Sequence, residues 1–144
     1  MNEAHHRKLE RMYHNNDRTN AYYRPRLEVA DGAATLTMQV REEMLHAARA
    51  VHGSIYFKAL DDAAWFAVAS RIEDVFVLTA SFNIHLVRPV SEGTMRASGR
   101  LVHGSGRLHL AESELFDDEG RLLARGSGSF MRSKVPLAPE LGYA

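Results

Sequence analysis

The sequence predicts an α+β domain in which an antiparallel sheet of about six strands wraps around one long central helix. The segment 54–70 is apolar around most of its helical circumference, which is typical of a helix enclosed in a core. Two strand-like segments precede it and four follow it, and their short, glycine-containing connections favour antiparallel neighbours. The chain has 144 residues, the size of one domain. We therefore expect residues 1–144 to form a single domain.

The elements before the central helix form a short helix and a hairpin. Apolar residues recur at helical spacing from Glu3 to His14, and the polar residues that follow predict a turn that ends this N-terminal unit, 1–20. Alternating apolar residues on both sides of Asp31-Gly32 predict the hairpin.

The central helix and four strands account for the rest of the domain. Ser54 is the candidate N-cap of the helix. Segments of period two then predict strands at about 76–86, 94–102, 107–116 and 121–132. In the first of them Thr79 falls on the polar face, opposite the apolar residues. The prolines in 133–144 predict an irregular tail.

The composition narrows the possible partners and chemistry. Eighteen basic residues balance eighteen acidic ones, so we expect neither nucleic acid nor an anionic membrane as a partner. The absence of cysteine excludes disulfides, thiolate metal sites and cysteine nucleophiles, and the eight histidines show no metal-ligand spacing. No apolar run approaches the roughly 18 residues of a membrane span, and the N-terminus lacks the apolar segment of a secretory signal. These features predict a cytoplasmic protein without metal or cofactor.

The tripeptide His52-Gly53-Ser54 lies where a loop meets the start of the central helix. Free backbone N–H groups and the positive end of the helix dipole make such a position suitable for a developing oxyanion. The same residues also fit a purely structural role, with Gly53 permitting a sharp turn and His52 binding buried carbonyl groups.

Two adjacent carboxylates lie about two turns further along this helix. Asp61 and Asp62 have mostly alanine neighbours, so one of them is expected to face inward, where an unpaired carboxylate would be costly as mere structure. Alternatively, either group is solvated or paired with Lys58 or Arg71.

The segment 52–63 resembles the His-Gly-Gly…Asp signature of hotdog-fold acyl-CoA thioesterases. The resemblance is to the phenylacetyl-CoA thioesterase-like branch of the 4-hydroxybenzoyl-CoA thioesterase superfamily. Three further segments resemble this family in order: 83–89, 103–107 and 118–130. Together they extend the resemblance over Leu27 to Met131.

The resemblance implies a role for each matching position. Asp61 corresponds to the helix carboxylate that acts as general base or nucleophile. Thr79 corresponds to a strand hydroxyl that helps hold the attacking water. Gly53, with Ser54, corresponds to the pair whose backbone N–H polarises the thioester carbonyl, and His52 corresponds to a histidine that positions the loop.

Two positions depart from the family pattern. His46 stands where the family commonly has asparagine, and Ser54 replaces the second glycine. The resemblance also implies a homodimer or a dimer of dimers, that is a homotetramer, with the active site at the subunit interface. Gly106 and Arg107 are candidates for binding the coenzyme A nucleotide, and His46 and His52 for contacts with the substrate.

These features predict an enzyme that hydrolyses an acyl-CoA thioester to a free acid and CoA. Two alternatives remain: a non-catalytic acyl-CoA binding protein, and an enoyl-CoA hydratase or dehydratase that pairs His46 with Asp61. The expected acyl pocket contains aromatic residues near the central helix: Tyr56, Phe57, Trp65 and Phe82.

Overall fold

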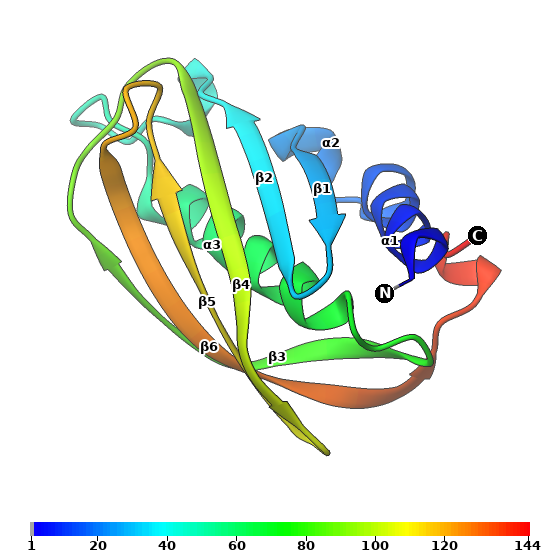
Figure 1. Ribbon diagram of the computed structural model, residues 1–144. Coiled ribbons are helices and arrows are strands. Elements are labelled where there is room, and N and C mark those ends of the chain that lie inside the picture. The colour runs from blue at the N-terminus through cyan, green and yellow to red at the C-terminus, as the bar shows by residue number, and fades with distance from the viewer. Residues whose placement is uncertain (1) are drawn as a thin grey trace.

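A six-stranded antiparallel sheet curls around one long helix (Figure 1) in the computed structural model, which describes residues 2–144. The strand order is β1-β2-β4-β5-β6-β3. The helices are α1 (Glu3–Asn16), α2 (Asn20–Tyr23), α3 (Gly53–Ala69) and the short 3₁₀ helices η1 (Glu42–Met44) and η2 (Pro139–Leu141). The strands are β1 (Arg26–Ala30), β2 (Ala33–Gln39), β3 (Val75–Leu86), β4 (Thr94–Ser105), β5 (Leu108–Phe116) and β6 (Leu122–Pro136). The predicted α+β fold is confirmed.

Helix α3 lies directly against the concave face of the sheet because the residues at the contact are small. A Cβ on Gly99 of β4 would lie 2.2 Å from the carbonyl oxygen of Ala63, so only glycine lets the two backbones approach this closely. On β5, the Ser113 hydroxyl donates to the carbonyl oxygen of Leu60 at 2.8 Å. These contacts fix both the depth and the rotation of α3 in the sheet.

Helix α1 and the C-terminal segment close one end of the core. The His5 ring donates from Nε2 to the carbonyl oxygen of Ala69 at 2.8 Å, and its Nδ1 then accepts from the Tyr143 hydroxyl at 2.7 Å. Leu9 and Tyr13 lie on the same buried face of α1. The N-terminal helix is thereby joined to the C-terminal end of α3 and to the last residues of the chain (Figure 1).

The structure corrects three details of the predicted elements. Helix α3 begins at Gly53, with His52 and not Ser54 as its N-cap, because the His52 ring accepts the Ser54 N–H. Strand β6 continues to Pro136, so the segment expected to be irregular from 133 begins as strand, and η2 follows it. Helix α2 was not expected, because turn-forming residues surround it.

The fourth correction concerns β3, where the alternation of period two is interrupted. The pairing with β6 shifts between Thr79 and Ser81, which marks a β-bulge at Ala80. Thr79 therefore lies on the inner face, paired with the buried Phe130, while Leu78 is 52% exposed. The prediction that Thr79 lies on the polar face of this strand, opposite its apolar residues, is wrong for this reason.

Strand β3 is an edge strand. It pairs with β6 on one side, and no strand among residues 2–144 pairs with its other side. This leaves a twelve-residue edge that can add a further strand.

The close approach at Gly99 predicts a large effect of a single methyl group. Gly99→Ala should lower the free energy of unfolding by about 1–3 kcal/mol, because the added Cβ pushes α3 away from β4. Urea denaturation followed by circular dichroism measures this. Ser98→Ala, at the exposed neighbouring position of β4, is the control and should change the stability little. Equal stabilities of the two variants would contradict the proposed contact.

Candidate active site

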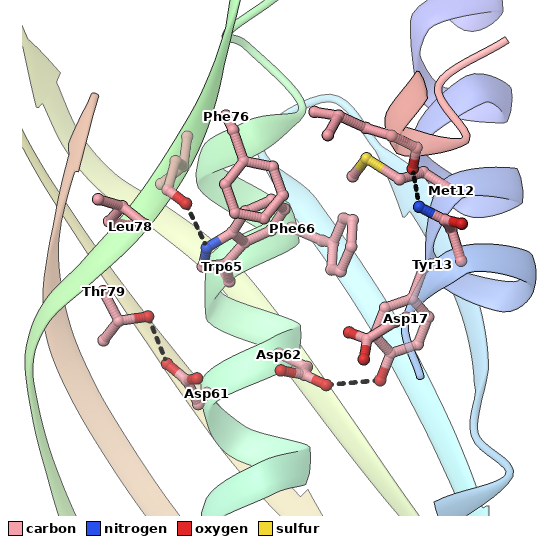
Figure 2. A pocket seen from close by; sticks show the side chains of 13 residues that line it. Met12, Tyr13, Asp17, Asp61, Asp62, Trp65, Phe66, Phe76, Leu78 and Thr79 are labelled. Atoms are coloured by element: carbon pink, nitrogen blue, oxygen red, sulfur yellow. Dashed lines mark hydrogen bonds between the residues drawn. The ribbon is translucent and has the colours of Figure 1, made fainter. Parts of the chain in front are cut away.

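Asp61 and Thr79 meet between α3 and β3. The Thr79 hydroxyl donates to Asp61 Oδ1 at 2.9 Å (Figure 2). The bulge at Ala80 makes this contact possible, because it turns Thr79 toward the helix. The two residues that the family resemblance paired are therefore neighbours in space.

The carboxyl group of Asp61 has a pKa well above the ordinary value for aspartate. Burial raises its pKa from 3.8 to about 6, the neighbouring Asp62 carboxylate raises the pKa further, and the Thr79 hydrogen bond and Lys58 oppose this rise. Among residues 2–144, no basic side chain forms an ion pair with Asp61. A carboxyl group with a pKa near 6 is ionised at neutral pH and still basic enough to accept a proton from water.

Asp62, the next residue on α3, is engaged by two side chains of the protein and has a structural role. Its Oδ2 accepts from Lys58 Nζ at 2.8 Å and from the Tyr13 hydroxyl at 2.5 Å. The alternative of a paired carboxylate thus holds for Asp62, with Lys58 as the partner, whereas Arg71 pairs with Asp31. Burial raises the pKa of Asp62, and the Lys58 ammonium group opposes the rise.

A cavity of about 440 Å³ opens beside Asp61 and Thr79. Figure 2 shows the side chains that line it, which come from α1 and the residue after it, Asp17, and from α3, β3 and η2. The apolar ones are Met12, Trp65, Phe66, Phe76, Val77, Leu78 and Leu141. The cavity is therefore a mostly apolar space whose lining includes two carboxylates without an ion-pair partner among the described residues, Asp61 and Asp17.

The N-terminus of α3 lies beside a second, smaller cavity of about 300 Å³, which Gly53 and His46 help to line. His52 Nδ1 accepts from the backbone N–H of Ser54 at 3.0 Å, so this amide is already engaged. The Gly53 N–H is at the first helical position, where no intrahelical partner exists. Gly53 and not Ser54 is therefore the amide available to a ligand.

Asp61 and Gly53 do not converge within one chain. They lie eight positions apart on α3, which at about 1.5 Å per residue corresponds to about 12 Å along the axis. A single carbonyl group cannot contact both at once. The sequence-based hypothesis that both act on one thioester therefore requires a second copy of the chain.

The other predicted site residues lie apart from this pair. Gly106 and Arg107 form the tip of the β4–β5 hairpin, which protrudes from the sheet (Figure 1), and line neither of the two cavities described above. His46 lies in the loop before α3, where its Nδ1 accepts from the backbone N–H of Ala48 at 3.1 Å. Binding of coenzyme A by Gly106 and Arg107 remains a prediction.

Of the aromatic residues expected in the acyl pocket, only Trp65 lines the cavity beside Asp61. Tyr56 lines the smaller cavity at the start of α3. Phe82 lies three residues after Thr79 on β3 and is not part of the cavity lining beside Asp61. Sequence reasoning missed the contribution of α1, from which Met12 and Tyr13 line the cavity. The amphipathic pattern of α1 shows that these residues are buried, but not against which element.

The described residues contain neither a candidate metal cluster nor a helix that could span a membrane. Across positions 2–144, no three His, Asp or Glu side chains come together as a metal site would require. No helix in this part of the chain has both the length and the apolar character needed to cross a bilayer.

Comparison with known proteins identifies the family. Residues 49–124 match the model of the thioesterase superfamily, so the chain belongs to this superfamily. A Sulfurisphaera tokodaii protein named "Putative esterase" is 27% identical over 102 residues, which cover 70% of this chain and 75% of that protein. Membership supports a thioester hydrolase in general terms.

Solved structures confirm the hotdog fold. The PaaI protein from the phenylacetic acid degradation operon of E. coli superposes with a TM-score of 0.82 at 21% identity and covers 93% of this chain and 99% of its own. A mutant form of the phenylacetic acid degradation protein PaaI from Thermus thermophilus gives a TM-score of 0.74 at 23% identity, with 81% of this chain and 100% of that chain covered.

The raised pKa of Asp61 predicts that this residue reduces stability. Because the folded pKa of about 6 exceeds the ordinary 3.8, the ionised carboxylate destabilises the fold. The cost is absent below about pH 4 and complete above about pH 6. Asp61→Asn should therefore raise the free energy of unfolding by on the order of 2 kcal/mol at about pH 8 and hardly at all at about pH 4. Urea denaturation at both pH values checks this, and a gain that does not depend on pH would contradict it.

Proposed function

We propose that this protein hydrolyses acyl-CoA thioesters, with Asp61 as the general base. The observation that carries the proposal is the Asp61 carboxylate, held by Thr79 at the side of an apolar cavity with its pKa raised to about 6. A thioesterase requires a base of this strength beside a space for the acyl group. Superfamily membership supports the same chemistry.

The proposed reaction starts with a water molecule bound to Asp61. The carboxylate removes a proton from the water as its oxygen attacks the thioester carbonyl carbon, and the carbonyl becomes an oxyanion. The C–S bond then breaks, and protonated Asp61 returns the proton to the departing thiolate of CoA. Direct attack by the carboxylate through an anhydride is the alternative route, but the Thr79 hydrogen bond occupies one of the two carboxylate oxygens.

The oxyanion donor in this proposal is the Gly53 N–H of a second copy. In the proposed dimer, two β3 strands pair antiparallel through the edges that the strand order leaves free, and we place the two-fold axis near Asn83, the register that brings Thr79 of one copy toward Leu86 of the other. Thr79 of one copy then lies beside residues 85–87 of the other. Leu86 is next to Gly53, since its Cδ1 lies 3.3 Å from the position that a Cβ on Gly53 would occupy. This pairing brings the base of one copy to the helix N-terminus of the other.

The base assignment predicts both a rate and a pH profile. Asp61→Asn should lower kcat by about 10²–10⁴-fold, measured as release of free thiol from a panel of acyl-CoAs. In the wild type, kcat/KM should fall about tenfold per pH unit below about 6, because Asp61 must be ionised to accept a proton. Thr79→Val should move this acid limb to higher pH, since the lost hydrogen bond had lowered the pKa.

Thr79→Ser retains the hydroxyl and is the matched control, which should keep the wild-type profile. Unchanged turnover in Asp61→Asn would refute the base assignment. Saturable acyl-CoA binding without thiol release from any substrate would favour the non-catalytic binding protein instead.

The donor assignment predicts a difference between two substitutions of Gly53. Gly53→Pro removes the N–H at a helix position where proline is well accepted, and it should lower kcat by about 10²–10³-fold. Gly53→Ala keeps the N–H and adds only a methyl group that meets the flexible end of Leu86, so it should retain most of the activity. Thiol release by the two variants measures the contribution of the amide.

Mixing variants tests whether the two groups belong to different copies. Inactive Asp61→Asn and Gly53→Pro chains, unfolded together and refolded, should recover about a quarter of the wild-type rate, because about half of the dimers are mixed and each has one intact site. No recovery, although mixed dimers form, would place both groups of each site in the same copy.

A further inference from the structure

The cavity beside Asp61 has an apolar wall on the side of α1, whose residues have no role in the proposed chemistry. Helix α1 contributes Met12 and Tyr13 to it, and η2 contributes Leu141 (Figure 2). On the opposite side are Trp65 and Phe66 of α3. The N-terminal helix and the C-terminal turn thus enclose one side of the space that begins at the proposed base.

The polar groups along this wall already have partners within the protein. The Trp65 indole N–H donates to the carbonyl oxygen of Val77 at 3.1 Å, and the Tyr13 hydroxyl donates to Asp62. The Asn16 amide donates to the carbonyl oxygen of Leu141 at 2.8 Å. Apart from the carboxylates and the second N–H of the Asn16 amide, the surface that remains for a ligand is therefore apolar.

The charges near the cavity are negative. Asp17, Asp61 and Asp62 line it, and Lys58 forms an ion pair with only the last of these. A carboxylate entering this space would lose its hydration without gaining a cationic partner. An anionic chain end is thus disfavoured by both desolvation and repulsion.

We propose that this cavity binds the acyl group of the substrate, and that the substrate class is uncharged, apolar acyl-CoA of medium length. This inference rests on the proposed function. A volume of about 440 Å³, at about 30 Å³ for a water-sized group and with incomplete filling, has room for on the order of ten methylene-sized groups. Met12 and Leu141 line the cavity on the side of α1, and in this proposal they limit the length of the acyl chain.

Trp65 provides a direct measurement of binding, since it is the one tryptophan of the chain and it lines the cavity. Its fluorescence is followed while decanoyl-CoA is added to the Asp61→Asn variant, in which hydrolysis is blocked. A saturable change is expected, with decanoyl-CoA binding about tenfold or more tightly than butyryl-CoA because additional methylene groups leave water. The decanoyl-CoA analogue with a terminal carboxylate should bind at least about tenfold more weakly than decanoyl-CoA itself.

A pair of substitutions tests the wall. Leu141→Phe, in the same background, should weaken decanoyl-CoA binding about fivefold or more and leave butyryl-CoA unchanged, because the larger ring shortens the cavity. Leu108→Phe makes the same change at a residue of β5 that is 49% exposed and lies outside the cavity lining, and it should alter neither affinity.

The results for binding and for hydrolysis are separable. Equal affinities for butyryl and decanoyl groups, no change in Trp65 fluorescence, or equal effects of Leu141→Phe and Leu108→Phe would overturn the proposed acyl site. If wild-type protein hydrolyses acyl-CoAs without a preference for chain length, the function stands and the acyl site is wrong. If decanoyl-CoA binds as expected but no thiol is released, the acyl site stands and the function is wrong.

Discussion

The close contact between α3 and the sheet determines the rest of this structure. Gly99 lets β4 run directly over the backbone at Ala63, and the Ser113 hydroxyl binds the carbonyl oxygen of Leu60. The helix cannot rotate or move outward without losing these contacts. Because Asp61 lies between these two helix positions in sequence, its direction toward β3 follows from packing that involves no catalytic group.

This packing divides two adjacent carboxylates between two tasks. Successive residues on a helix point about 100° apart, so Asp61 faces β3 while Asp62 faces α1. Asp62 meets Lys58 and Tyr13 and helps to attach α1. Asp61 meets one hydroxyl and an apolar space, and its pKa rises because burial is not balanced by a cation. The same ionised group that reduces stability at neutral pH is the one that the proposed hydrolysis needs as its base.

In the proposed mechanism, each copy carries both halves of the active site but holds them too far apart to use together. The base and the free amide are fixed on one rigid helix about 12 Å from each other. The open edge of β3 offers a way to bring complementary halves from two copies together. In the proposed dimer, pairing of edge strands protects the exposed backbone and completes the proposed active site in one step.

Much of the fold could be predicted from local pattern, because the relevant forces act between near neighbours in the chain. The Ala-rich segment around Asp61 required a buried helix, and the alternating segments with glycine turns required antiparallel strands. The sequence by itself also determined which residue types are available for chemistry, including the absence of thiols. Only the tertiary structure decided that Thr79 faces inward, since a bulge depends on how β3 pairs with β6. It alone also decided that the Ser54 amide is occupied by His52 and that Met12 faces the same cavity as Asp61, because such contacts depend on the packing of separate elements and not on spacing along the chain.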